Sequence, residues 1–451
     1  MTAPPTARRR SLFRHPDFAR LWSAATISLF GTQVSQVAIP VIAVLLLKAS
    51  PGEVGLLTTI EFLPFLLFTL PAGVWVDRLS RRRILIVADI GRGLMLASIP
   101  IAFALGGLTI WQLYLVGFVN GVMTVFFDVA DMSYLPTILD RDDLIEGNSK
   151  LQVSQSSAQI LGQPVGGGLV ALLSAPFAVI IDAISYVGSA LLIFSIRRKE
   201  QPGTAAASSG GVSAGEAGDT PGSGVSVAAE AAVAVKEPRS SMRSDIAAGL
   251  RYIASQRFLR NIAASTGTSN LCSNITFAIF AVYVYRDLGL SPAQVGIFGG
   301  IGGAGVLVGA LVASRVGERF GVGPTIVGSM AVTGPFVLLI PLATAQTAFW
   351  FLSAAFFFTG LLNVVYNVNQ VSLRQAITPE RMLGRMNATM RFLVWGTIPL
   401  GSLIGAGLSE LIGVHQTIWL GAILGLLPFL FVLLSPVRSL RRIPDPEPSE
   451  A

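Results

Sequence analysis

Long apolar runs separated by short charged turns restrict what this chain can fold into. The run from Val54 to Val76 contains Glu61 as its one charged residue, and a second apolar run begins at Ile84. Each run is long enough to cross a bilayer, which takes about 20 residues as a helix. The turn between them, Gly73 to Arg83, carries one Asp and four Arg. The sequence therefore predicts two membrane helices joined by a tight, basic turn.

Composition agrees with a membrane protein. Of 451 residues, 52% are hydrophobic and 13% are charged, whereas soluble domains carry about 25% charged residues. The net charge of +7 would favour nucleic-acid binding if the Arg residues lay on one soluble face. They lie instead in short clusters between apolar runs, so they indicate membrane topology and we expect no nucleic-acid partner.

Several classes of chemistry lack the residues they need. One cysteine, Cys272, excludes an internal disulfide, and His15 and His415 are too far apart in the sequence to favour a metal site. No Gly-Lys pair is present for a phosphate loop, and the Gly-x-Gly-x-x-Gly match at 300–305 lies inside an apolar run, where we expect a packing surface. We therefore expect no enzyme activity, metal or cofactor.

The distribution of basic residues predicts the orientation. Of 32 Lys and Arg residues, only Lys48 and Arg286 fall on predicted outer loops, so both termini are expected in the cytoplasm of a cell with this protein in its plasma (inner) membrane. The fold class expected is an all-α membrane protein of about twelve transmembrane helices. The predicted spans are 21–47, 53–76, 84–107, 109–137, 144–173, 176–196, 258–285, 293–315, 322–343, 346–373, 384–412 and 416–436.

The chain also repeats itself at an offset of about 240 residues. Asn148 and Gly162 align with Asn387 and Gly401, and Gly55 aligns with Gly296. Between the halves, the composition changes to Gly, Ala, Ser, Val and Glu, which is typical of a flexible linker. The expected organisation is a cytoplasmic N-terminus (1–20), a six-helix bundle (21–198), a cytoplasmic linker (199–244), a second six-helix bundle (245–437) and a cytoplasmic tail (438–451).

The turn after the second span resembles the loop motif G-x-x-x-D-R-x-G-R-R of the major facilitator superfamily of secondary transporters, with Ser80 in place of the second Gly. The resemblance implies two bundles that alternate access to a site between them. It also implies a latch that holds the cytoplasmic ends together. The residues that match, or that form a weaker copy or partner in the second half, are Gly73, Asp77, Arg78, Arg81, Arg82, Glu318, Arg319 and Arg391.

The end of span five resembles the antiporter motif G-P-x-x-G-G of drug-exporting members, with Gln163 in place of its first Gly. The matching small residues and proline are Gly162, Pro164, Gly167 and Gly168. Ordinary close helix packing is the alternative. The span-four Arg of that family would fall at Gly117, so coupling through it does not transfer. Further similarity at 127–130, 133–136 and 146–148 is to the drug:proton antiporter branch with macrolide-efflux and enterobactin-exporter proteins, which implies proton-driven export.

Four acids inside predicted spans are candidates for proton coupling, because an ionised side chain in a bilayer costs about 3 kcal/mol or more. Glu61 lies in the outer half of span two, with a static hydrogen bond as the alternative. Asp128 and Asp131 share one face of span four. The alternative to proton coupling is a structural ion pair with Arg391 for Asp128, and simple solvation at the inner surface for Asp131. Asp182 lies near the outer end of span six, where a simple helix-end acid is the alternative.

Neutral polar and aromatic side chains in the spans are candidates for a cavity that takes an amphiphilic organic substrate. Bonding between helices is the alternative for many of them. The candidates are Gln33, Gln36, Phe62, Phe126, Phe127, Gln155, Gln159, Gln163, Asn270, Asn274, Asn363, Asn367, Gln370 and Trp395.

The function these features favour is proton-coupled export of a small amphiphilic compound by a monomer in the lipid bilayer. An importer of a metabolite and a transport-incompetent sensor or secretion partner with the same fold are the alternatives. Net substrate flux separates the sensor from the transporters, and the sign of the pH gradient required separates export from import. A channel is disfavoured because repeated halves with latch loops imply alternating access.

Overall fold

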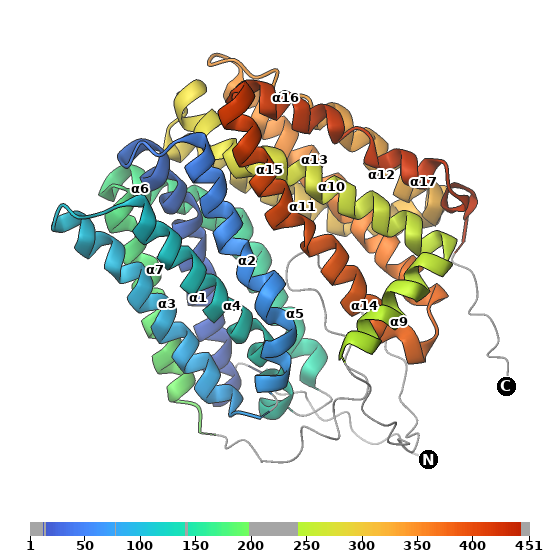
Figure 1. Ribbon diagram of the computed structural model, residues 1–451. Coiled ribbons are helices and arrows are strands. Elements are labelled where there is room, and N and C mark those ends of the chain that lie inside the picture. The colour runs from blue at the N-terminus through green and yellow to red at the C-terminus, as the bar shows by residue number, and fades with distance from the viewer. Residues whose placement is uncertain (1–11, 13–14, 77, 140–142, 198–241, 443–451) are drawn as a thin grey trace, which may run out of the picture.

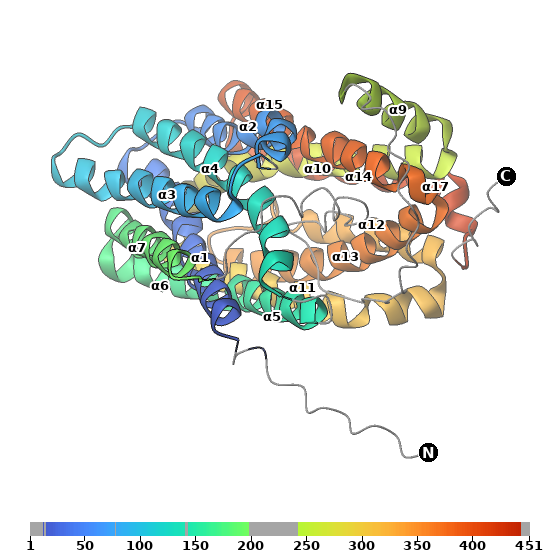
Figure 2. The same cartoon turned by 90° about the horizontal axis from the view of Figure 1, so that it is seen from below.

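Two bundles of long helices lie side by side in the computed structural model of the protein (Figures 1 and 2). The structure describes residues 12, 15–76, 78–139, 143–197 and 242–442. We call the end of the bundles at which the first helix begins the terminal face, and the opposite end the far face. Most of the predicted linker lies outside the described residues; its last three residues are helical, because a helix that was not predicted begins at Met242.

The first bundle holds the first six predicted spans. Span five is one continuous stretch, 144–173, with a π-helical turn in the middle. The elements are α1 (Pro16–Val41), η2 (Ile42–Leu46), α2 (Pro51–Val76), α3 (Arg81–Ala104), α4 (Ile110–Ile138), α5 (Leu144–Ser157), η4 (Ala158–Gly162), α6 (Gln163–Leu173) and α7 (Ala175–Phe194).

The second bundle repeats this plan after the short helix α9. Span eleven is divided at Gly396 into two helices. The elements are α9 (Met242–Ser255), α10 (Arg257–Val282), η5 (Tyr283–Asp287), α11 (Pro292–Phe320), α12 (Val322–Val337), α13 (Ala348–Ile377), α14 (Glu380–Trp395), α15 (Thr397–Ile412), α16 (Val414–Leu424), α17 (Pro428–Leu433) and η6 (Pro436–Ser439).

The helical stretches correspond to the twelve predicted spans. In the described part of the chain, nine are long and apolar enough to cross a membrane by length and composition. The other three are span five with its Gln-rich face, the polar α10 and the shorter α12. Lipid offers no partner for free N–H and C=O groups, so a helix, which satisfies them internally, suits such runs. The all-α membrane fold is therefore confirmed.

The internal repeat is visible in the backbone at the far face. Spans one and seven both end in a π-helical turn, η2 and η5. Each is followed by a residue with positive φ, 52° at Lys48 and 65° at Gly289. The next helix then starts in both halves with Ser and Pro, a favourable pair at the N-cap and first helical position. The offset of about 240 residues thus relates equivalent structures.

Two seams of small residues join the bundles in the half of the molecule near the far face. In the first, α6 packs on α11, where a Cβ added to Gly167 would lie 3.2 Å from the Cα of Gly296. In the second, α2 packs on α15, where a Cβ added to Gly55 would lie 2.6 Å from the Cβ of Ala406. Toward the terminal face the ribbons of the two bundles diverge (Figure 1).

The glycines at 300–305 belong to these contacts, so the expectation of a packing surface is confirmed. One face of α11 meets span five, with Gly300 against Pro164. The other face meets α13, with Gly302 against the ring of Phe356. Glycines on two faces let α11 approach both neighbours closely.

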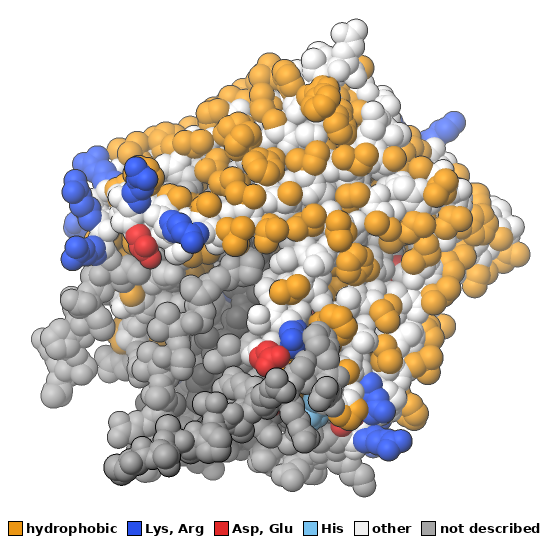
Figure 3. Space-filling model, turned by 180° about the vertical axis from the view of Figure 1, so that it is seen from behind, with side chains coloured by type: hydrophobic (Ala, Val, Ile, Leu, Met, Phe, Trp, Pro, Cys, Tyr) orange, Lys and Arg blue, Asp and Glu red, His pale blue; other side chains and the backbone are white. Residues whose placement is uncertain are grey.

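The outer surface fits a bilayer (Figure 3). The visible face is largely hydrophobic across the middle of both bundles, and Lys and Arg side chains gather toward their ends. The large apolar side chains that the protein exposes include Leu94, Trp111 and Leu191. An apolar belt between charged ends is what a lipid-embedded helix bundle requires.

The antiporter-motif glycines provide a matched test of the first seam. We expect Gly167→Val to lower the unfolding temperature of the purified protein, because overpacking costs about 1–3 kcal/mol and its Cβ would meet α11. Gly168→Val is the control, since a Cβ there meets nothing within 4 Å. Equal unfolding temperatures for the two variants would contradict the seam.

Candidate functional site

A buried ion pair on α3 is the most unusual feature of the first bundle, and it was not among the predicted site residues. The Arg92 guanidinium donates to Oδ1 of Asp89, one turn away on the same face. Asp89 is 0% exposed and Arg92 is 4% exposed. Two charges in so apolar a place need each other, because an unpaired buried charge costs several kcal/mol.

Two aromatic rings hold this guanidinium in place. Its Cζ lies 4.2 Å from the ring centroid of Phe127 on α4 and 4.3 Å from that of Tyr186 on α7. A flat cation between ring faces gains both electrostatic and stacking energy. The Tyr186 hydroxyl in turn shares a 2.9 Å hydrogen bond with Thr32 of α1. Four helices therefore fix the position of Arg92.

Asp128 and Asp131 of α4 interact with this pair. Both are half-buried. Asp128 interacts electrostatically with Arg92 and, across the two bundles, with Arg391 of α14. Asp131 interacts with Asp128 and with Asp89. Three carboxyl groups thus interact electrostatically with one guanidinium in this part of the first bundle, so their negative charge exceeds its positive charge if all of them are ionised.

The equivalent positions in the second bundle carry amides in place of acids. Asn367 and Gln370 of α13 occupy the repeat positions of the two α4 acids, and Gln370 Nε2 donates to Asn367 Oδ1 at 2.7 Å. Two polar residues spaced three apart are therefore a hydrogen-bonded pair of amides in the second bundle and two acids in the first.

Asp182 joins the charged group from α7. It is 1% exposed, accepts a 3.2 Å hydrogen bond from the Ser185 hydroxyl, and interacts electrostatically with Arg92. Room for it comes from Gly31 of α1, where a Cβ would lie 2.7 Å from its Oδ1. This burial inside the bundle disfavours the alternative of a helix-end acid.

Glu61 lies apart from that group, between α2 and α4. It is half-buried, and a Cβ added to Gly117 would lie 2.9 Å from its Cγ. Gly117 is the position to which the resemblance in the sequence assigned a span-four arginine, and here the stem of Glu61 fills the space beside it.

Some of the predicted cavity residues meet between the bundles. Phe62 contacts Phe65, and Phe65 contacts Trp395 of α14, with 6.0 Å between ring centroids in both pairs. The Arg391 guanidinium lies 4.3 Å from the Trp395 ring centroid. An aromatic surface with one cation therefore bridges α2 and α14.

Other predicted cavity residues mainly bond or pack helices. Phe126 stacks on Trp75 at 5.7 Å, and Asn270 donates to the Val394 carbonyl at 3.3 Å, beside the break in span eleven. Gln33 packs against Gly162, whereas Gln159 and Gln163 lie in the seam with α11. Asn274 donates to the Asn270 carbonyl. Gln155 is half-buried, and Gln36 and Asn363 are exposed.

The predicted cytoplasmic latch lies at the terminal face. Asp77 is outside the described residues. Arg82 donates to the Ile193 carbonyl at 3.3 Å and to that of Phe194, at the end of α7 in its own bundle. Arg78, Glu318 and Arg319 are exposed, Arg81 is half-buried, and Gly73 borders open space.

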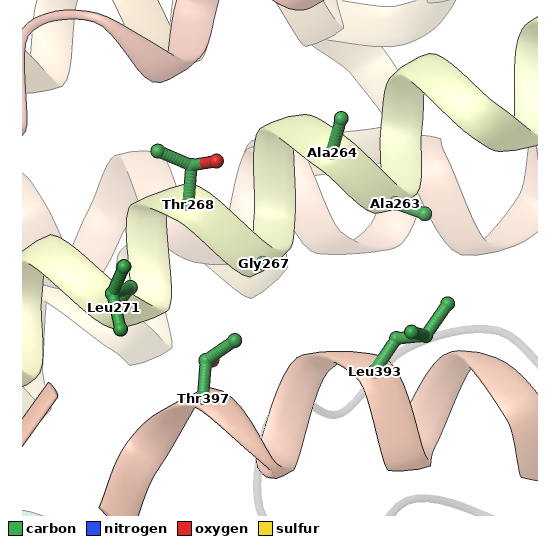
Figure 4. A pocket seen from close by; sticks show the side chains of 7 residues that line it. All are labelled: Ala263, Ala264, Gly267, Thr268, Leu271, Leu393 and Thr397. Atoms are coloured by element: carbon green, nitrogen blue, oxygen red, sulfur yellow. The ribbon is translucent and has the colours of Figure 1, made fainter. Parts of the chain in front are cut away.

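A cavity of about 290 Å³ opens between α10 and the break in span eleven at Gly396, with Leu393 of α14 and Thr397 of α15 on the two sides of the break. Figure 4 shows its lining of small and apolar side chains, with Thr268 and Thr397 as the polar ones. The described residues that line it include no charged group, so it is separate from the acids of the first bundle.

This arrangement of two six-span bundles with a charged group in one of them can be compared with known proteins. The family model of the Major Facilitator Superfamily matches residues 21–272 and 262–451. The chain belongs to the major facilitator superfamily. It is therefore a multi-pass membrane transporter and not an enzyme, and the resemblance read from the loop motif is confirmed.

Its relatives are similar over nearly their whole length. The enterobactin exporter EntS of Salmonella choleraesuis is 22% identical over 443 residues, 95% of each chain. The multidrug efflux pump Tap of Mycobacterium tuberculosis is 25% identical over 419 residues, 90% of each chain. A bacterial homologue of the iron transporter ferroportin in its inward-facing state has a TM-score of 0.68 at 15% identity, covering 94% of this chain and 99% of that one. That structure shows the shared fold.

The charge pair on α3 was missed although a signal for it existed. Asp89 and Arg92 are the two charged residues within the run 84–107, and their spacing of three places both on one helix face. Neither residue was among the predicted site residues, although Asp128, Asp131 and Asp182 all interact with this cation.

We expect Arg92→Gln to destabilise the protein by about 3–5 kcal/mol, because it leaves the Asp89 carboxyl buried without its guanidinium. Adding Asp89→Asn should restore most of the loss, since the pair is then neutral. Unfolding temperature and yield of monodisperse protein measure both effects. A double variant no more stable than the single one would show that the two charges do not stabilise each other.

Proposed function

We propose that this transporter is a proton-coupled antiporter that exports a small amphiphilic compound, with its terminal face in the cytoplasm. The observation that carries the proposal is the excess of acids around Arg92 in one bundle, opposite a neutral amide pair in the other. A set of acids with too few cations takes up and releases protons more readily than a balanced one.

Asp128 is the acid best placed to couple protons to movement. It interacts with Arg92 in its own bundle and with Arg391 in the other bundle. When Asp128 is ionised it attracts Arg391, and when it is protonated that attraction is lost. Proton binding then changes the relative stability of two arrangements of the bundles, as alternating access requires. Asp131 and Asp182 belong to the same group, and Glu61 is a second, separate candidate.

The expected substrate follows from the surface between the bundles. Phe62, Phe65 and Trp395 offer aromatic faces, and Arg391 adds a positive charge. Such a surface suits a molecule with aromatic or apolar parts and some polar groups. Relatives named as an enterobactin exporter and a multidrug efflux pump support export. In the state that is closed at the terminal face, Asp77, Arg78 and Arg81 would hold the cytoplasmic ends of the bundles together.

Transport by purified protein in liposomes with an imposed pH gradient tests this proposal. With lipophilic cations, macrolides and siderophores as probes, we expect the wild type to move at least one compound against its gradient while protons move the other way. We expect Asp128→Asn to reduce this driven transport at least tenfold while exchange of labelled for unlabelled substrate continues. The variant keeps the proposed substrate surface, but it has no carboxyl group at position 128 to carry a proton.

The control is Asp143→Asn, the same chemical change in the turn before α5, which should leave driven transport unaltered. Driven transport that persists in Asp128→Asn but fails in Glu61→Gln would move the coupling role to Glu61. Transport in the direction of the proton gradient would contradict antiport, and no proton movement with any probe would contradict the proposed coupling.

A further inference from the structure

Two charged side chains of the second bundle reach across the far face and bond to the backbone of the first. Glu410, near the end of α15, accepts a 2.7 Å hydrogen bond from the backbone N–H of Gly52. Arg286 of η5 donates from Nη2 to the carbonyl of Val44 at 2.7 Å. These bonds join different pairs of spans, two to eleven and one to seven.

Both charges meet backbone groups that suit them. Gly52 lies in the first turn of α2, where N–H groups lack helical partners and the helix dipole favours a negative charge. Val44 lies in the π-helical turn that ends span one, and an Arg is a good donor to a carbonyl there. The first bundle thus supplies only main-chain atoms, and the charged groups come from the second.

The repeat has no equivalent of either bond. The positions that correspond to Glu410 and Arg286 in the first half are Ala171 and Leu45. At the matching seam, α6 and α11 approach through Gly167 and Gly296 without a charged contact in the described contacts between them. The two bonds are therefore additions to the glycine packing, not a consequence of the shared fold.

We propose that Glu410 and Arg286 form a far-face latch, which holds the bundles closed at that face and must release when the transporter opens there. Both bonds cross between bundles that have to separate at the far face during alternating access. The role is independent of the substrate, of the direction of transport and of proton coupling.

Glu53 offers a matched control for the carboxylate. It lies in the same first turn of α2, and its Oε2 accepts a 2.7 Å hydrogen bond from the backbone N–H of Ser50 within its own bundle. Glu53→Gln and Glu410→Gln remove the same charge from the same place. Only the second change weakens a hydrogen bond between the bundles, because Gln accepts from the Gly52 N–H without the negative charge.

Distances across the far face measure the latch directly. In a Cys272→Ser background, which removes the single cysteine, spin labels at Gly107→Cys and Gln346→Cys report the separation of the bundles by double electron–electron resonance. Both positions are exposed, in the turns between α3 and α4 and between α12 and α13. We expect Glu410→Gln and Arg286→Gln each to raise the ratio of the open to the closed population about fivefold, the size expected for an exposed charged hydrogen bond.

Glu53→Gln should leave the distance distribution unchanged, and Glu410→Asp should fall between Glu410→Gln and the parent. Distributions for Glu410→Gln and Arg286→Gln that superimpose on the parent would overturn the proposal. An equal shift in Glu53→Gln would also overturn it, because the effect would then be local to the start of α2. If Glu410→Gln fails to fold, Arg286→Gln tests the same latch through the other pair of spans.

Discussion

The structure depends on close backbone contact between the two bundles near the far face. Gly167 against Gly296 and Gly55 against Ala406 bring helices of opposite halves together almost without side chains between them. Lipid tails are as apolar as the side chains they contact, so the hydrophobic effect does not drive helices together in a membrane. Helices there associate through packing and polar contacts. The two seams therefore set where the bundles touch, and the divergence at the terminal face follows from them.

Charge is divided unequally between halves that share one backbone plan. The first bundle carries the acids around Arg92, while the equivalent positions of the second hold Asn367 and Gln370. At the far face the division is reversed, because Glu410 and Arg286 belong to the second bundle and bond to main-chain atoms of the first. A duplicated scaffold has thus acquired separate charged groups in each half, whereas the backbone plan and the glycine seams remain common to both.

Much of the fold could be predicted because it follows from local pattern. Apolar runs of bilayer length and the charged turns between them predicted twelve spans close to those observed. The candidate site was predicted less well. Spacing placed Asp128 and Asp131 on one face of α4, but the contact of Phe127 with the Arg92 guanidinium was not predicted, because Arg92 comes from a neighbouring helix. The helix α9 was missed because its 14 residues are too few to span a bilayer; it packs on α14 through Gly249 against Thr389.

The sequence by itself determined the class of the protein, since burial of apolar runs, backbone hydrogen bonding and basic turns act over a few neighbouring residues. It also determined that acids lie within the spans, and that the loop belongs to a transporter family. The tertiary structure decided which charges meet. Asp89 finds Arg92 within one helix, but Asp128 reaches Arg391, and Glu410 reaches Gly52, only when helices hundreds of residues apart pack together. Electrostatic partners depend on distance in space, and no local pattern in a chain encodes the distance between two helices.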